Sequence, residues 1–196
     1  MNPSILVLSG SVRSGSVNTQ LASLVSRHLS LENAHVTQVS LRDYPLPIYD
    51  GDLEEEHGIP ENAHKLRVLL EKHQGIFVAS PEYNSSVTPL LKNTLDWISR
   101  IIKTGEEPLE VFSKGVYALG GASPGVYGGM RSLMHLRVIM EVSLGATVIP
   151  EMISVNFAGK AFNENGELAK EFAQKRLTKM VERLVRESGY VKMENS

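Results

Sequence analysis

The sequence contains no cysteine, which excludes disulfide bridges, thiolate catalysis, cysteine-ligated zinc and iron–sulfur clusters. It has no surplus of charge either, because 20 basic residues face 22 acidic ones and no lysine- and arginine-rich run occurs. We therefore expect neither a nucleic acid nor a membrane as a partner. No apolar run approaches the length of a membrane span, and the first residues lack a signal-peptide pattern. These absences predict a soluble, cytoplasmic protein.

Short apolar runs alternate with segments of helical periodicity. The predicted strands lie at 5–8, 34–41, 76–79, 116–119 and 147–149. Helical spacing covers Leu21 to Leu29, Ala63 to His73 before Gly75, 90–102, a segment ending near Leu144, and a stripe of Leu168, Phe172, Leu177, Val181 and Leu184. The acidic run Glu54-Glu55-Glu56 is expected in a solvated loop. This alternation predicts an α/β fold with a doubly wound parallel sheet, in a single domain spanning residues 1–196.

The loop at 9–20, SGSVRSGSVNTQ, is rich in hydrogen-bond donors. Its donor side chains are those of Ser11, Arg13, Ser16, Asn18 and Thr19. Ser16 and Val17 stand where a Walker A loop needs lysine and serine or threonine, and no Gly-x-Gly-x-x-Gly pattern is present. We therefore expect a phosphate monoester at the start of the following helix. The alternative is that Ser16 or Asn18 only caps this helix.

Two further polar loops follow predicted strands, and parallel strands would bring all three loops to one edge of the sheet. Pro81-Glu82-Tyr83-Asn84 offers a flat ring and amide donors that suit a planar heterocycle, or it is an ordinary turn with a surface tyrosine. The stretch 120–129 holds five glycines, counted in GGASPGVYGG. Glycine permits close backbone approach, so this loop is expected to form a ligand wall rather than a flexible linker.

Four stretches of the sequence match a recurring pattern. GSVRSGSVNTQLA resembles the G-S-x-R-x-x-S-x-N-x-x-L-A signature of the NADPH-dependent FMN reductase family. SPEYNSSVTPLLKNTLDWISR closely resembles the P-E-Y-N-x-S-x-x-x-x-L-K-N-x-x-D-W segment of that family, and YPLPIYDGD and GGASPGVYGGMRSLMHLR resemble two more of its stretches. The resemblance extends from residue 4 to about 150.

The resemblance implies a flavodoxin-like three-layer sandwich whose five-stranded parallel sheet has the order 2-1-3-4-5. It implies FMN as cofactor, NAD(P)H as co-substrate, a homodimer or homotetramer, and a small-molecule electron acceptor such as a free flavin, a quinone, an azo dye or a metal oxyanion. Carried over by position, the FMN phosphate would meet Ser11, Arg13, Ser16, Asn18 and Thr19, the isoalloxazine would meet Pro81, Glu82, Tyr83 and Asn84, and Gly121, Ala122, Ser123 and Gly125 would close over the ring.

The resulting hypothesis is an NAD(P)H-dependent FMN oxidoreductase. An electron-carrier flavodoxin and a non-catalytic flavin-binding sensor are the alternatives, although carriers are usually strongly acidic and this chain is not. Hydride transfer to a flavin needs no acid–base pair, so His135 is expected to be structural. Trp97 lies off the apolar stripe of its helix and is interpreted as an oligomer contact, or alternatively as a core residue against the 44–50 loop. Lys92 and Asp96 are spaced to pair.

Overall fold

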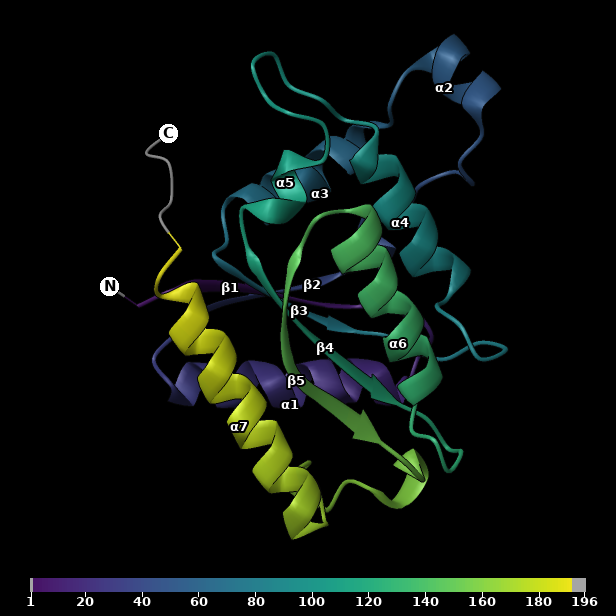
Figure 1. The fold of residues 1–196 in the computed structure, drawn as a ribbon. Coiled ribbons are helices and arrows are strands. Elements are labelled where there is room, and N and C mark those ends of the chain that lie inside the picture. Colours follow the sequence, from purple (N-terminus) through teal and green to yellow (C-terminus); the bar gives the residue numbers. More distant parts are fainter. Residues whose placement is uncertain (1, 192–196) are drawn as a thin grey trace.

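A five-stranded parallel sheet forms the middle layer of the molecule, with helices on both of its faces (Figure 1). The structure is a computed structural model that describes residues 2–191. The strands are β1 (Ser4–Ser9), β2 (His35–Ser40), β3 (Gly75–Ala79), β4 (Val116–Ala122) and β5 (Thr147–Val155). All neighbouring strands are parallel, in the order β2-β1-β3-β4-β5. The predicted α/β class and the strand order implied by the resemblance are therefore confirmed.

Helices connect the strands on both sides of the sheet. The α-helices are α1 (Val17–Leu31), α2 (Gly51–His57), α3 (Glu61–Glu71), α4 (Pro89–Ser99), α5 (Glu110–Ser113), α6 (Met130–Val138) and α7 (Glu171–Ser188). Shorter helical turns are η1 (Leu41–Asp43), η2 (Ile139–Ser143) and η3 (Ala158–Lys160). The helices α1 and α7 pack on one face, and α3 to α6 on the other (Figure 1). Within residues 2–191, no helix has the length and apolar character that crossing a bilayer would demand.

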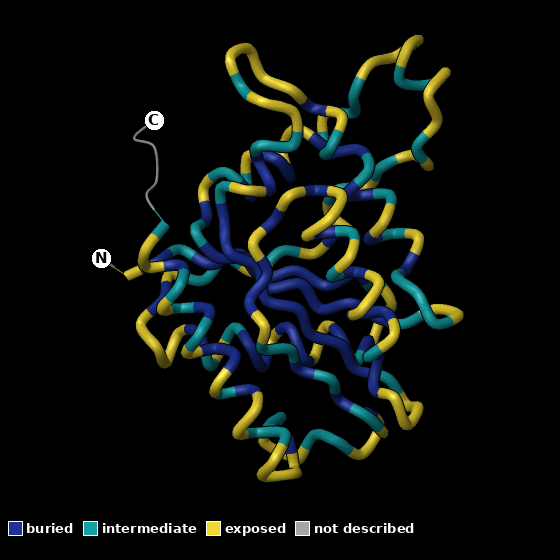
Figure 2. The backbone as a smooth tube through the Cα atoms, in the orientation of Figure 1, coloured by how far each residue is buried: buried dark blue, intermediate teal, exposed yellow. Residues whose placement is uncertain are grey.

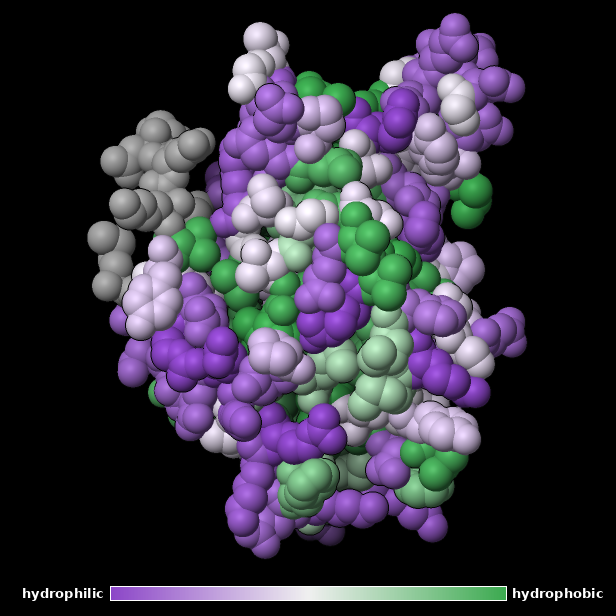
Figure 3. Space-filling model, viewed as in Figure 1, coloured by the Kyte–Doolittle hydropathy of each residue, from purple (hydrophilic) through white to green (hydrophobic). Residues whose placement is uncertain are grey.

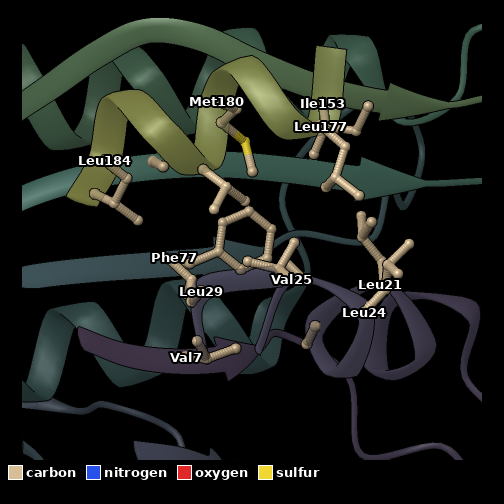
Figure 4. Packing of buried hydrophobic residues seen from close by; sticks show 14 of the residues in the cluster. Val7, Leu21, Leu24, Val25, Leu29, Phe77, Ile153, Leu177, Met180 and Leu184 are labelled. Carbon is tan, nitrogen blue, oxygen red and sulfur yellow. The ribbon is translucent and has the colours of Figure 1, made fainter. Parts of the chain in front are cut away.

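The central strands bury both of their faces. Successive side chains of a strand point to opposite sides, so Ile5 and Val7 of β1 pack under α1 and α7, while Leu6 and Leu8 pack under the helices opposite. Figure 4 shows side chains from α1 and α7 meeting around Phe77 of β3. In Figure 2 burial is concentrated in the central strands, and exposure is concentrated in the loops and outer helix surfaces. Continuous apolar runs therefore form doubly buried strands, as the sequence predicts.

The last two strands are longer than their sequence pattern indicates. Gly120, Gly121 and Ala122, expected in a loop, belong to β4. A Cβ atom on Gly120 would lie 2.6 Å from the ring of Phe77, so the missing side chain lets the strand pass over a large neighbour. The strand β5 continues through Pro150. It is an edge strand, so it tolerates a proline, which has no N–H to donate to a neighbouring strand.

Two predicted helix boundaries are wrong. Gly75 starts β3 instead of ending the preceding helix, and a Cβ atom there would lie 2.3 Å from the Ser188 Oγ. This glycine therefore permits the close packing of α7 on the sheet. Leu168 precedes α7, and Phe172 is 72% exposed, so neither belongs to the buried stripe of that helix. The stripe consists of Leu177, Met180, Val181 and Leu184.

The acidic run Glu54-Glu55-Glu56 lies on α2 and not in the predicted loop. The Asp50 side chain caps this helix by accepting a hydrogen bond from the Asp52 N–H at 2.9 Å. Glu54 also pairs with Arg100, the residue that follows α4, with 2.9 Å between Oε2 and Nε. A cap and one tertiary ion pair thus give helical structure to a short segment whose hydrophobic pattern did not predict it.

Trp97 is a core residue and its interpretation as an oligomer contact is wrong. Its side chain is fully buried, and its Nε1 donates a hydrogen bond to the Pro47 carbonyl oxygen at 2.8 Å. Its ring meets that of Tyr49 edge-on, with 5.0 Å between the centroids. The alternative contact with the 44–50 loop is therefore confirmed. The Lys92–Asp96 ion pair is present as predicted, with 2.6 Å between Nζ and Oδ1.

Candidate functional site

The loops that follow β1, β3 and β4 leave the same edge of the sheet (Figure 1). We call them the first loop (10–16), the second loop (80–88) and the third loop (123–129). The strand order reverses between β1 and β3, and ligands of such sheets bind outside the carboxyl ends of the strands at this point. The structure thus brings the three predicted loops to the expected edge, where hydrogen bonds join them.

The first loop leads into a capped helix. The Ser16 Oγ accepts hydrogen bonds from the N–H groups of Asn18 at 3.3 Å and Thr19 at 3.4 Å, so Ser16 caps this helix, as the alternative interpretation held. The positive end of α1 still borders an open pocket lined in part by Ser11, Arg13, Ser16 and Thr19. This pocket can accommodate an anion.

Two arginines stand at this pocket. Arg13 is exposed, and its guanidinium has no hydrogen-bond or ion-pair partner within residues 2–191. Arg42 was not predicted from the sequence; it follows β2 and donates a hydrogen bond through Nη2 to the Val12 carbonyl oxygen. The strand order could have indicated it, because β2 ends beside β1. The pocket therefore has one anchored and one unpaired guanidinium, a setting suited to phosphate.

The Asn18 side chain joins the first loop to the end of β4. Its Oδ1 accepts a hydrogen bond from the Ala122 N–H at 2.8 Å, and its Nδ2 donates to the Ala122 carbonyl oxygen at 2.8 Å. The side chain is buried, so water does not replace either bond easily. Asn18 and Ala122 thus set the position of α1 relative to the third loop.

A tight turn shapes the second loop. Tyr83 and Ser86 exchange two backbone hydrogen bonds of 3.0 Å, and Asn84 and Ser85 between them have φ angles of 48° and 67°. Both angles fall in the left-handed region, as a type I′ turn requires. The Tyr83 N–H is therefore used inside the turn, whereas those of Asn84 and Ser85 have no acceptor in the described part of the chain. The Tyr83 side chain is 54% exposed.

Glu82 points to α6. Its Oε2 accepts hydrogen bonds from the N–H groups of Arg131 at 3.1 Å and Ser132 at 3.3 Å, and its Oε1 accepts one from Arg131 Nε at 2.8 Å. Burial by itself would raise the pKa of the Glu82 carboxyl, but the hydrogen bonds from Arg131 and Ser132 hold this pKa below its usual value. The Ser132 Oγ also donates to the Pro81 carbonyl oxygen at 2.9 Å. Pro81 and Glu82 therefore fix the second loop on α6.

The third loop begins after two buried residues of β4, Gly121 and Ala122. A Cβ atom on Gly121 would lie 3.0 Å from the Ser80 carbonyl oxygen, so this glycine allows the second and third loops to approach. The Ser123 Oγ accepts a hydrogen bond from the Gly125 N–H at 3.2 Å. Gly125 is exposed, and only the Ser123 Oγ would lie near a Cβ atom there. The open part of the third loop is thus at Gly125.

His135 of α6 borders the second loop, and Tyr127 of the third loop lies beside Arg131 of α6. The His135 Nδ1 lies 3.0 Å from the Ser86 Oγ, a contact consistent with the structural role predicted for this histidine. Tyr127 is 60% exposed, with the Arg131 guanidinium 4.8 Å from the centroid of its ring. Tyr127 was not predicted, because its sequence position in a glycine-rich stretch carries no distinguishing signal.

The donors at this edge fit the two ends of FMN. A phosphate monoester suits the unpaired Arg13 guanidinium and the start of α1. A planar ring with carbonyl and imine edges suits the exposed Tyr83 side chain and the free N–H groups of Asn84 and Ser85. The residues present are therefore compatible with the cofactor implied by the resemblance.

Comparisons with known proteins agree with the family that the sequence resembles. The model of the family described as NADPH-dependent FMN reductase matches residues 3–160. The chain is 33% identical over 166 residues to a quinone reductase of Escherichia coli strain K12. This alignment covers 84% of this chain and 84% of that protein. It is 31% identical over 182 residues to an NAD(P)H-dependent FMN reductase of Pseudomonas aeruginosa, covering 88% of this chain and 90% of that protein.

A solved structure agrees in fold. FerB, a flavoenzyme NAD(P)H:(acceptor) oxidoreductase from Paracoccus denitrificans, superimposes with a TM-score of 0.78 at 24% sequence identity. The match covers 96% of this chain and 98% of FerB. At this identity the likeness supports the flavodoxin-like fold, and the evidence for activity comes from the sequence relatives.

Proposed function

The chain belongs to the NADPH-dependent FMN reductase family, and from this premise we propose that it uses NAD(P)H to reduce FMN at the three loops and passes the electrons to a small acceptor. A quinone is the acceptor class that the relative from Escherichia coli supports. The observation that carries the site assignment is the unpaired Arg13 guanidinium at the start of α1. The cytoplasm, which supplies reduced nicotinamide nucleotides, is the proposed compartment.

For the phosphate of FMN, we assign direct contacts to Ser11, Arg13 and Thr19. All three line the pocket at the start of α1, and each offers a polar side-chain donor. Ser16 and Asn18 act on this pocket by holding the backbone, since their side chains already bond to the helix start and to Ala122. The aligned peptide dipoles of α1 add partial positive charge at the same place.

For the isoalloxazine, we assign the ring of Tyr83 and the N–H groups of Asn84 and Ser85. Pro81 and Glu82 support them by tying the second loop to α6. Backbone N–H groups held in a fixed turn favour negative charge on the ring that they face, because they need no reorganisation when charge develops. When bound between these residues, FMN would supply the two-electron redox chemistry.

The third loop is proposed to border the ring on its other side. Ser123 and the exposed Gly125 form the contact surface, and Gly121 and Ala122 hold it through their places in β4. A glycine at the ring edge lets the backbone approach a flat ligand closely. The exposed side chain of Tyr127, which extends from the same loop, is available to pack against an aromatic acceptor.

Steady-state turnover tests this function. The purified chain with FMN is mixed with NADPH or NADH and with a quinone, free FMN or an azo dye, and loss of the reduced nicotinamide is followed by absorbance. Rapid loss that depends on the acceptor supports a reductase. FMN binding without nicotinamide oxidation by any of these acceptors would overturn it in favour of an electron carrier or a flavin-binding sensor.

We also infer that copies of the chain associate through α6 and η2. Met134, Val138 and Val142 are spaced one helical turn apart and are 50%, 56% and 79% exposed. Figure 3 shows hydrophobic residues gathered over α6 on this face. Apolar helix faces of this kind favour burial against a partner. Light scattering of the unmodified chain should give a mass above that of one chain, and Val138→Glu should lower this mass. A mass of one chain for the unmodified protein would contradict the inference.

A further inference from the structure

A second pocket adjoins the third loop, between the end of β5 and the start of α7. Its lining residues are Ser154, Val155, Asn156, Phe157, Lys160, Ala161, Leu168, Lys170 and Ala173, and we call it the lysine pocket. The Phe157 N–H donates to the Gly125 carbonyl oxygen at 3.3 Å, and the Ala158 N–H donates to that of Ser123 at 3.0 Å. These two hydrogen bonds thus join the segment that lines the lysine pocket to the third loop, which borders the proposed flavin site. Figure 1 shows the end of β5 beside the loop after β4.

The two lysines of this pocket carry uncompensated charge. Neither Lys160 nor Lys170 forms an ion pair with any residue from 2 to 191, and both are exposed. The two carboxylates closest in sequence to Lys170 are engaged elsewhere: Glu171 pairs with Lys175 at 2.7 Å, and Glu167 pairs with Arg27 at 3.0 Å. The pocket therefore presents two positive charges without a protein counter-ion, which favours an anionic ligand.

A flat apolar surface stands beside these charges. The Phe157 side chain is 51% exposed, and the Lys170 Nζ lies 6.0 Å from the centroid of its ring. An aromatic ring next to two cations provides the complementary parts for a phosphorylated nucleoside, because the base can stack while the phosphate pairs with lysine. An inorganic anion would use the lysines but not the ring.

The start of α7 adds to the positive field. Lys170 is the cap residue of this long helix, no side chain caps it, and Ala173 of its first turn lines the pocket. The first N–H groups of an uncapped helix are unpaired donors with partial positive charge. They supplement the two lysines and do not constitute a site without them.

We propose that the lysine pocket binds a phosphate of the reduced nicotinamide dinucleotide, with the adenosine part against Phe157. This inference rests on the proposed function, since the dinucleotide must place its nicotinamide at the flavin site on the other side of the third loop. The phosphate has two possible sources in that ligand: the 2′-phosphate, which only NADPH carries, and the diphosphate, which NADPH and NADH share. In either case Lys160 and Lys170 set the affinity for the nucleotide.

Calorimetric titration tests the pocket without turnover. The FMN-loaded chain is titrated with 2′,5′-ADP and with 5′-AMP, and the Lys160→Gln/Lys170→Gln variant is compared with Lys72→Gln, which removes an exposed charge from the opposite face. Loss of two charge-assisted contacts should raise the Kd of 2′,5′-ADP by about ten-fold or more. The control variant should change the Kd of 2′,5′-ADP by less than about two-fold. No binding by the unmodified chain, or equal losses in both variants, overturns the proposal.

Kinetics with the two nicotinamides then identify the phosphate. If the double variant raises KM for NADPH alone, the pocket binds the 2′-phosphate; if it raises both KM values, the pocket binds the diphosphate. Both results support the proposal, and unchanged KM values for both overturn it. Failure of the proposed function is a separate result, because the unmodified chain would then oxidise neither nucleotide with any acceptor.

Discussion

Arg13 and Asn18 belong to one stretch of sequence, but their side chains have opposite surroundings. Asn18 is buried and bonded through both of its polar atoms to the backbone of Ala122. Arg13 is exposed and has no partner within the described residues. A buried, fully used amide holds structure in place, because breaking its bonds leaves unpaired polar atoms. An exposed, unpaired cation is instead available to a ligand.

Arg13→Ala should weaken FMN binding about ten- to a hundred-fold, because a charge-assisted hydrogen bond to the phosphate is lost. Quenching of flavin fluorescence during titration of the FMN-free chain measures the Kd. Arg13→Lys keeps the positive charge but lacks the planar guanidinium, so its Kd for FMN should lie between that of the unmodified chain and that of Arg13→Ala. Arg186→Ala, an exposed arginine near the end of α7, is the matched control. Equal affinity for Arg13→Ala and the unmodified chain would contradict the phosphate assignment.

Tyr117→Phe should raise the free energy of unfolding by about 1 kcal/mol, because the hydroxyl of Tyr117 is buried without a hydrogen-bond partner among the described residues. Burial also raises the pKa of this tyrosine. Urea unfolding followed by circular dichroism measures the change. Phe112→Leu in the same apolar layer should destabilise and serves as the comparison. A clear loss of stability in Tyr117→Phe would show that the hydroxyl has a partner in solution.

At the scale of elements, the second loop depends on α6 for its position. Glu82 accepts hydrogen bonds from the first turn of α6, and Ser132 of this helix donates to the Pro81 carbonyl oxygen. The turn at Tyr83 to Ser86 follows directly, and its exposed donors are aimed by these contacts. A carboxylate at a helix N-terminus is favoured by the N–H groups and by the helix dipole.

Glu82→Gln should lower the free energy of unfolding at neutral pH by about 1–2 kcal/mol, because the Arg131 pair and the anionic cap are lost. The comparison is Glu141→Gln, which removes an exposed partner of Arg137 and should cost about 0.5 kcal/mol or less. Thermal unfolding of both variants measures the difference. Equal stabilities of the two variants would show that Glu82 does not anchor the loop.

On the scale of the whole molecule, partly buried carboxylates connect segments that are distant in sequence. Glu106 bonds to Arg67 and Lys114, and Glu167 bonds to His28 and Gln174. Burial by itself would raise the pKa of both carboxyls, but the bonds from Lys114 to Glu106 and from His28 to Glu167 outweigh it and lower each pKa. Glu82 behaves in the same way. The folded state therefore favours their charged forms.

Acid should destabilise the fold for this reason. A carboxyl whose pKa is lower in the folded state contributes stability above its unfolded pKa of about 4.3, and this contribution is lost as the pH falls through the folded value. The free energy of unfolding should thus fall below about pH 4.5 in urea titrations. Glu106→Gln should flatten this dependence, whereas Glu56→Gln, an exposed residue on α2, should not. Identical slopes for the two variants would contradict this account.

The sequence contained much of the fold and part of the site. Apolar runs predicted β1, β3 and the start of β4 because strands buried on both faces need continuous hydrophobic residues. The loops were predicted because polar, glycine-rich stretches interrupted this pattern. The sequence did not predict the helix α2, the ends of β4 and β5, or the roles of Glu82 and Arg42. These features depend on partners that are distant in sequence.

Residue order alone determined that this chain forms alternating strands and helices and places donor-rich loops after particular strands, because hydrophobic periodicity and glycine content are local properties. Tertiary structure decided which donors remain available. It committed Asn18 to Ala122 and Glu82 to α6, left Arg13 unpaired, and buried Trp97 against Pro47. Hydrogen bonding and burial depend on what stands opposite each side chain, and only the packed fold sets that.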